Sequence, residues 1–347
     1  SKAILEKEDW LELVEGPQGK QYTLKVSMED AWADEMVKRI KQYIDWGINV
    51  TTVGVQNESN YSPPNTQTCM WEPERLGRFI SQKLQPRLTV AGLKVKIASP
   101  DIAYVGYKAS ELERFLPAIN DAVDVVAYHM YDSFKEDMNG SIHMLVENSN
   151  RVSAIRRESF PKKRLWMTET TGVQWNSDTW HTYGWRPELT EQDKAIKAGR
   201  YLHMTLVNAG AHAFLWWGLV YSLAPEKEKN PEVRQKHRDE GLVLVKEQRQ
   251  ANGRQEFLER TKKFYVIKQY ANFIKKGYRR VEIPHVPKMQ VSAYVSPDRK
   301  TVVAVAINDT KVSQSLAIAP PFGITESSVY QTDTQRNCEE VPISSLI

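Results

Sequence analysis

The sequence contains few cysteines: only Cys69 and Cys338 occur among its 347 residues. Two cysteines exclude a disulfide scaffold and a cysteine-rich metal site. The chain also lacks any run of about 18 apolar residues, so we expect no membrane-spanning segment. Its formal net charge is only +4, and no block of lysine and arginine dominates. Nucleic acid is therefore not an expected partner.

The motifs of several well-known chemistries are missing as well. There is no Walker loop, G-x-G-x-x-G fingerprint, H-E-x-x-H, C-x-x-C or G-x-S-x-G segment. These absences argue against a bound nucleotide, a zinc centre and a serine nucleophile, and we expect neither a cofactor nor a metal. Residues 1–10 do not form a secretory signal, but a signal can be removed, so this pattern does not favour the cytoplasm.

Aromatic side chains are abundant, with ten tryptophans and fifteen tyrosines. Aromatic residues at this density usually serve both the core and surfaces on which ligands stack. Apart from this excess, the composition is that of an ordinary globular protein.

Short apolar segments alternate with amphipathic ones over much of the chain. This alternation predicts strands at 50–56, 95–98, 123–129, 164–169 and 213–217, and helices at about 28–46, 73–84, 110–119, 142–157, 190–210 and 257–275. Thr190 and Asp193 have the spacing of a capping box. We assign no element to residues 1–27, and residues 225–256 are expected to form a long charged connection.

Strands that alternate with helices indicate a parallel sheet, and polar groups at the strand ends are typical of a (β/α)8 barrel. Five βα units are visible over residues 1–279, whereas a closed barrel needs eight. We expect a partial barrel, whose first strands are either absent or supplied by a further amino-terminal segment. Residues 280–347 alternate apolar with polar residues at 290–295, 302–307, 313–318 and 329–332, which predicts an antiparallel β-sandwich domain.

Two glutamates stand at the ends of apolar runs: Glu58 follows Val53–Asn57, and Glu169 follows Leu165–Thr168. A glycosidase needs two such carboxylates, one to protonate the leaving oxygen and one to attack the sugar or activate water. Barrel geometry would bring both to the same edge of the sheet. A single glutamate is usually only a solvated loop residue. The pairing at strand ends favours catalysis.

Three polar residues close to these glutamates are candidate binding residues. The side-chain amide of Asn57 can donate a hydrogen bond to a sugar hydroxyl. A turn residue of this type often hydrogen-bonds only to the neighbouring backbone instead. His129 and Tyr131 alternate at a strand end, so Tyr131 could hydrogen-bond Glu169 and His129 a sugar hydroxyl. A histidine in such a position is as often purely structural.

Five aromatic residues are candidate sugar-stacking residues. Neighbouring residues of a strand point to opposite faces, so one of Trp216 and Trp217 can line the sugar site and the other packs elsewhere. Trp175 lies in a loop, residues 174–185, that contains three further aromatic residues. Tyr61 and Trp71 follow Glu58. Each of these rings could instead belong to a small core of its own loop.

The ordered set of segments resembles glycoside hydrolase family 30. The matching segments are Val55–Glu58, Cys69–Pro73, Ile97–Asp101, Ala127–Tyr131, Trp166–Glu169, Phe214–Trp217 and Phe273–Tyr278. The resemblance implies a retaining glycosidase with a (β/α)8 barrel and a side β-sandwich, in which Glu58 is the acid/base and Glu169 the nucleophile. It also implies a secreted or periplasmic protein. Ser59 stands where the family usually has proline, a change beside the acid/base rather than in it.

The family includes xylanases, glucuronoxylanases, β-1,6-glucanases, β-1,6-galactanases and glucosylceramidase-like enzymes. Among these we favour an endo-acting xylan hydrolase. We expect a monomer, unless a further segment completes the barrel. Residues 218–222 lack the arginine that reads glucuronate, so we expect no dependence on that group. Two other classes stay open: a non-catalytic glycan-binding protein with an incomplete barrel, and a barrel hydrolase that uses a metal.

Overall fold

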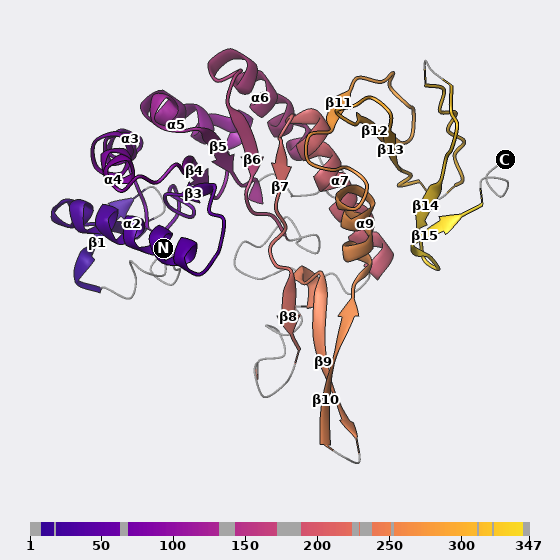
Figure 1. The fold of residues 1–347 in the computed structure, drawn as a ribbon, viewed down its shortest axis with the longest axis horizontal. Coiled ribbons are helices and arrows are strands. Elements are labelled where there is room, and N and C mark those ends of the chain that lie inside the picture. Colours follow the sequence, from indigo (N-terminus) through magenta and orange to yellow (C-terminus); the bar gives the residue numbers. More distant parts are fainter. Residues whose placement is uncertain are drawn as a thin grey trace. The chain divides into compact units, whose positions relative to one another are not determined.

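The computed structural model describes residues 8–16, 19–62, 69–131, 143–171, 189–223, 229, 238–250, 253–310, 312–320 and 323–342. The chain forms two compact units. The first consists of Ser1–Thr170 and Asn208–Leu215, and the second of Thr171–Val207 and Trp216–Ile347. Figure 1 traces the elements of both along the chain. The domain boundary expected after residue 279 lies inside the second unit and stays a prediction.

A five-stranded parallel sheet is the centre of the first unit. Its strands are β3 (Thr52–Gly54), β4 (Lys96–Ile102), β5 (Val125–Tyr128), β6 (Arg164–Met167) and β7 (Ala213–Phe214), and they pair in the order of the sequence. All four residues of β5, in the middle of the sheet, are buried. The predicted parallel sheet is therefore confirmed, as the half-barrel of a (β/α)8 fold.

Helices connect these strands, as the spacing of apolar residues predicts. They are α2 (Glu29–Asp45), α3 (Pro73–Arg78), η3 (Phe79–Leu84), α4 (Gln85–Val90), α5 (Ser110–Ile119) and α6 (His143–Ser159). On α2 the buried stripe contains Trp32, Met36 and Ile40, which are four residues apart and therefore share one face. A hairpin that the sequence did not predict, β1 (Leu11–Gly16) with β2 (Gly19–Leu24), precedes α2.

Close packing of α3 against α5 depends on Gly77. A Cβ at this position would collide with the backbone carbonyl of Ala118, which cannot move without shifting α5. We expect Gly77→Ala to lower the free energy of unfolding by about 1–3 kcal/mol, as overpacked core variants do. Urea denaturation measures the change. The matched control is Gly323→Ala, where a Cβ would meet nothing within 4 Å and the loss should stay below about 0.5 kcal/mol. Equal stability of both variants would contradict this packing.

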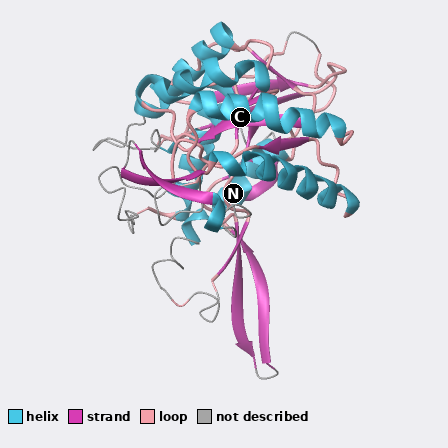
Figure 2. Cartoon of the chain, turned by 90° about the vertical axis from the view of Figure 1, so that its left-hand side faces the viewer, coloured by secondary structure: helices cyan, strands magenta, loops and turns pink. Residues whose placement is uncertain are grey.

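The second unit contains the helices α7 (Glu191–His203) and α9 (Lys262–Ala271), which pack together. Thr190 and Asp193 form the predicted capping box at the start of α7. The strands β9 (Val243–Gln250) and β10 (Gly253–Arg260) form a long antiparallel ribbon, and β8 (Val220–Ser222) lies parallel to β9 (Figures 1 and 2). The expected charged connection at 225–256 is thus partly wrong. The predicted helix from 257 begins only at Lys262, because β10 runs on to Arg260.

Antiparallel strands follow α9, as predicted. The strands β12 (Gln290–Val295), β13 (Val302–Ile307) and β14 (Val329–Thr332) have the expected bounds, and β11 (Arg279–Val281) and β15 (Asn337–Val341) join them. They form two sheets, β11-β12-β13 and β14-β15, and their packing as a sandwich stays a prediction. The strand expected at 313–318 is wrong. Ile318 is 58% exposed there, so the alternating pattern has no buried face to stabilise a strand. No helix in the described ranges is long and apolar enough to cross a bilayer.

Candidate active site

The two glutamates lie just beyond the carboxyl ends of their strands. Glu169 follows β6 by two residues, and Glu58 follows β3 by four. Glu58 has a left-handed backbone, with φ of 54°, and its N–H donates to the carbonyl oxygen of Asp101 at 2.8 Å. This bond fixes the turn after β3 to the end of the neighbouring strand β4. Both carboxylates thus stand at one edge of the sheet, as barrel geometry predicts.

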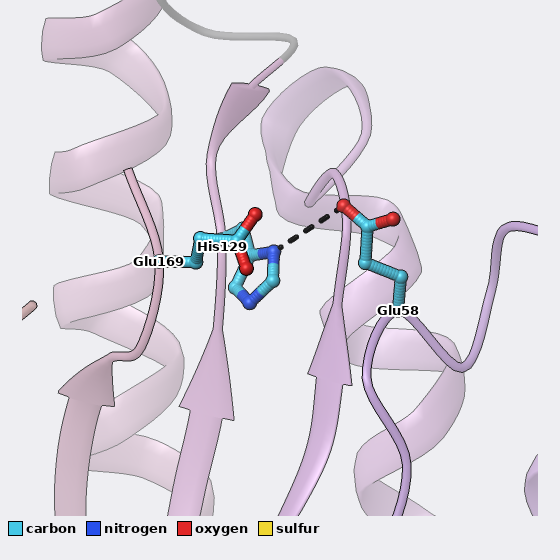
Figure 3. A group of neighbouring side chains, drawn as sticks. All are labelled: Glu58, His129 and Glu169. Carbon is cyan, nitrogen blue, oxygen red and sulfur yellow. Dashed lines mark ion pairs between the residues drawn. The ribbon is translucent and has the colours of Figure 1, made fainter. Parts of the chain in front are cut away.

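The carboxylates face each other across His129 (Figure 3). One carboxylate oxygen of each glutamate and one ring nitrogen of His129 all lie within 4.8 Å of one another. Carboxyl groups of retaining glycosidases are about 5–5.5 Å apart, and those of inverting enzymes about 6.5–9.5 Å. The observed spacing matches the shorter of the two arrangements.

His129 is buried between two carboxylates. Its Nδ1 lies 3.5 Å from Oε1 of Glu58 and its Nε2 lies 3.4 Å from Oδ1 of Asp101. These are long contacts of ion-pair type rather than short hydrogen bonds. Burial disfavours the charged ring, but the contacts with Asp101 and Glu58, together with the charge of Glu169, raise the pKa of His129 to about 10. The surrounding carboxylates therefore favour the protonated form of the ring.

Of the two roles that the sequence leaves open for His129, the surroundings of the ring fit the structural one better than a contact with a sugar hydroxyl. The side chain of His129 is only 1% exposed, and each ring nitrogen faces a carboxylate, so the ring has no free edge for a substrate. Its backbone N–H, which donates to the carbonyl oxygen of Ile102 at 2.8 Å, keeps the end of β5 against β4. His129 acts on its neighbours rather than on a ligand.

Asp101, a third carboxylate, was not among the residues singled out from the sequence. It is the second-last residue of β4 and has a left-handed backbone conformation, with φ of 56°. Its Oδ1 accepts a hydrogen bond from the hydroxyl of Thr168, the residue before Glu169. The sequence offered one signal, a carboxylate at a strand end. The partners of Asp101 come from three other strands and are visible only in the fold.

Tyr131 has the predicted contact with Glu169. Its hydroxyl donates to Oε1 of Glu169 at 2.8 Å. Burial raises the pKa of the Glu169 carboxyl above its usual range, and the charges of Glu58 and Asp101 act in the same direction. The cationic His129 and the Tyr131 hydrogen bond oppose that rise, because both stabilise the ionised form. Tyr131 and His129 thus limit the rise in the pKa of Glu169 that burial causes.

The sequence is similar to a curated glucuronoxylanase. No family model matches the sequence. The glucuronoxylanase XynC of Bacillus subtilis is 22% identical over 302 residues, which cover 85% of this chain and 56% of XynC. The chain thus spans about half the length of the curated relatives it matches.

Solved structures agree with the sequence comparison. A family 30 endoxylanase from Clostridium papyrosolvens matches with a TM-score of 0.64 at 19% identity, over 96% of this chain and 70% of the other. A conserved exported protein from Bacteroides fragilis matches with a TM-score of 0.70 at 19% identity, over 91% and 66%. An endo-β-1,6-glucanase gives 0.61 at 19% identity, over 94% and 65%. The chain resembles glycoside hydrolase family 30 in sequence and in fold.

Ser59, the departure from the usual family 30 proline, has a structural role here. Its side chain is buried, and its hydroxyl donates to the carbonyl oxygen of Pro100 at 2.5 Å. Proline has no donor that could form this bond. The serine therefore adds a second tie between the turn that carries Glu58 and the end of β4.

The remaining candidates near Glu58 have different surroundings. Trp71 is 1% exposed and packs against Phe79 at a ring distance of 4.9 Å, which fits packing in a core, the other role that the sequence leaves open, better than stacking on a sugar. Tyr61 is partly exposed and lies edge-on to Tyr104 at 5.9 Å. Asn57 is partly exposed as well. Sugar contacts of Tyr61 and Asn57 stay predictions.

The two tryptophans after β7 belong to the second unit. The indole N–H of Trp216 donates to the carbonyl oxygen of Glu240 at 2.7 Å, which fixes that ring within its own unit. Trp217 is 52% exposed. Their role at the carboxylates stays a prediction, and Trp175 lies outside the described residues.

The spacing of Glu58, His129 and Glu169 would also suit a metal ion. A histidine ligand must present a neutral nitrogen with a lone pair directed at the metal. In this structure the two ring nitrogens of His129 face the carboxylates of Glu58 and Asp101. A metal-dependent hydrolase therefore stays an alternative to a two-carboxylate glycosidase.

Proposed function

We propose that the chain is the carboxylate-bearing part of a retaining, endo-acting β-glycan hydrolase of xylan type. The observation that carries the proposal is the pair of glutamate oxygens within 4.8 Å, at one edge of a parallel sheet. Further support comes from the relatives, since the named family 30 proteins include xylan-degrading enzymes. The proposal covers three properties: retention of the anomeric configuration, cleavage inside the polysaccharide, and xylan as the substrate.

The proposed reaction has two steps. In the first, Glu169 attacks the anomeric carbon while Glu58 donates its proton to the leaving oxygen, and a glycosyl ester forms on Glu169. In the second, Glu58 removes a proton from water, which attacks the anomeric carbon and releases Glu169. The Tyr131 hydroxyl stabilises the charge of Glu169 before attack and after release.

The test is a screen of β-linked polysaccharides with product analysis. Incubation with xylan, β-1,6-glucan and β-1,6-galactan should release oligosaccharides from xylan first, with a fast fall in viscosity that marks internal cleavage. A β-1,6-glucanase is the second candidate, favoured by the similar fold of the endo-β-1,6-glucanase. Residues 218–222 lack arginine, so activity on xylan without glucuronate branches is expected despite the name of the Bacillus relative.

A non-catalytic glycan-binding protein is the alternative of another class. It is favoured by the sheet itself, which has five strands in the described part of the chain where a closed barrel has eight. Calorimetry that detects binding of xylooligosaccharides, together with no product from any glycan, would favour this alternative. We further propose a secreted or periplasmic monomer, supported by the exported relative, with any further barrel strands supplied by a separate segment.

Tyr131→Phe tests how the proposed nucleophile is tuned. Loss of the hydroxyl removes a charge-assisted hydrogen bond of about 1.5–3 kcal/mol, so the pKa of Glu169 rises further. The acidic limb of the kcat/KM profile should move to higher pH, and kcat/KM at pH 5 should fall about tenfold or more. Tyr330→Phe is the matched control, because the Tyr330 hydroxyl also donates to a glutamate, Glu340, but does so between β14 and β15. An unchanged acidic limb in Tyr131→Phe would contradict this role.

A further inference from the structure

Asp101 is connected to the ends of three neighbouring strands. Its backbone carbonyl accepts from the N–H of Glu58, after β3, at 2.8 Å. Its carboxylate faces Nε2 of His129, after β5, at 3.4 Å, and accepts from the hydroxyl of Thr168, after β6. One residue at the end of β4 thus links the strand ends that carry Glu58, His129 and Glu169. No direct step of the proposed reaction uses it.

We propose that Asp101 and His129 are a positioning pair: Asp101 holds the ring of His129 against Glu58 and ties that contact, through Thr168, to the strand that carries Glu169. The proposal rests on the proposed function for the roles of the two glutamates. Its geometry, with contacts at 3.4 and 3.5 Å on opposite sides of one buried ring, stands without them.

Two hydrogen bonds already hold the backbone around Glu58, so the remaining freedom of this residue is in its side chain. The bond from Glu58 N–H to Asp101 and the bond from the Ser59 hydroxyl to Pro100 hold the turn against β4 on both sides of the glutamate Cα. The side chain of Glu58 is 15% exposed and can still rotate about its own torsions. The contact of its Oε1 with Nδ1 of His129 restrains that rotation. The carboxyl is thereby kept facing Glu169.

Charge balance explains why the pair needs Asp101. Carboxylates face His129 from three elements: Glu58 after β3, Asp101 at the end of β4 and Glu169 after β6. The Tyr131 ring lies edge-on to it at 5.8 Å. A buried imidazolium is stable only with compensating charge close by. Without the Asp101 carboxylate the ring loses one of its two direct partners, and the Nε2 side is left without an acceptor.

Positioning matters for a general acid because its proton must lie within hydrogen-bond reach of the leaving oxygen. A displacement of about 1 Å can lower the rate about 100-fold. This loss depends on the leaving group, since a very acidic phenol departs without a proton. Loss of a residue that only stabilises the fold would instead lower the rates on substrates with poor and with good leaving groups alike.

The experiment uses Asp101→Asn, which keeps the shape and removes the charge. The control is Asp45→Asn, the same change at an exposed residue of α2. Nitrogen NMR of the histidine rings is the first readout, with the His129 signal identified by its loss in His129→Gln. We expect His129 to be doubly protonated at pH 8 in the wild type and in Asp45→Asn, and to be neutral in Asp101→Asn. If the His129 signal is unchanged in Asp101→Asn, the proposal that Asp101 holds the charged ring of His129 is wrong.

Kinetics on two aryl β-xylobiosides are the second readout. Asp101→Asn should lower kcat/KM, which reports formation of the glycosyl ester, about 30- to 100-fold on the phenyl glycoside and less than about threefold on the dinitrophenyl glycoside. Equal losses on both substrates would contradict positioning. If Asp101→Asn does not fold, Thr168→Val removes the donor to Asp101 and should give the same pattern with a smaller loss. If the wild type cleaves neither glycoside, the proposed function fails. The NMR result alone then decides whether Asp101 and His129 form a pair.

Discussion

Glu169→Ala is expected to lower the hydrolysis of xylan by at least about 10⁴-fold, the scale on which single nucleophile deletions act in other hydrolases. Glu169 is the group that forms the covalent bond to the sugar in the proposed reaction, and alanine leaves no atom to do so. In this variant the Tyr131 hydroxyl has no carboxylate at position 169 to which it could donate. Reducing-sugar release over several hours measures the residual rate.

The control for Glu169→Ala is Glu74→Ala, which removes an exposed glutamate of α3. It should retain wild-type activity within about twofold, as surface substitutions usually do. Azide can occupy the space left by the Glu169 side chain, and it should restore turnover by forming a glycosyl azide of inverted configuration. Full activity of Glu169→Ala without azide would exclude Glu169 as nucleophile.

Glu58→Ala is the second large effect, and its size depends on the leaving group. Loss of general acid catalysis should lower kcat/KM on xylan or a phenyl xylobioside about 10²- to 10⁴-fold. On a dinitrophenyl xylobioside the first step needs no proton, so the glycosyl ester should form rapidly and accumulate. Stopped-flow measurement should then show a burst of phenolate followed by slow turnover.

The burst distinguishes the role of Glu58 from that of Glu169. Glu169→Ala should give no burst with either glycoside, because no ester can form. In Glu58→Ala, azide should speed turnover and give a glycosyl azide of retained configuration, since the anion attacks the ester without a general base. Equal losses on both glycosides would contradict the assignment of Glu58 as the acid.

Much of the fold follows from local patterns. The strands β12, β13 and β14 and the helix α7 could be predicted because the apolar spacing and the capping residues lie within each segment. Glu58 and Glu169 could be predicted for the same reason, since a carboxylate after an apolar run marks a strand end.

The ribbon β9–β10 is the largest element that was missed. Its strands are rich in charged residues, which hid the alternation of the few apolar ones. One local signal was present in Asn252-Gly253, a dipeptide typical of tight hairpin turns. Charge composition alone therefore led to an expected loop where two strands pair.

The surroundings of single side chains could not be predicted. For His129 the sequence left a sugar contact and a structural role open, and its neighbours Glu58 and Asp101, which come from two other strands, enclose it. For Trp71 the sequence left sugar stacking and core packing open, and the ring packs on Phe79. Which residues meet across a sheet depends on register between strands, and that register is set by the whole fold rather than by any one segment.

The stereochemistry of hydrolysis tests the central claim most directly, because it depends on the separation of the two carboxylates. Proton NMR of a xylooligosaccharide during the first minutes of hydrolysis distinguishes the anomers before they interconvert. With glutamate oxygens within 4.8 Å, we predict that the β-anomer of the new reducing end appears first. An α-anomer that appears first would show inversion, and it would contradict Glu169 as a nucleophile that forms a covalent intermediate.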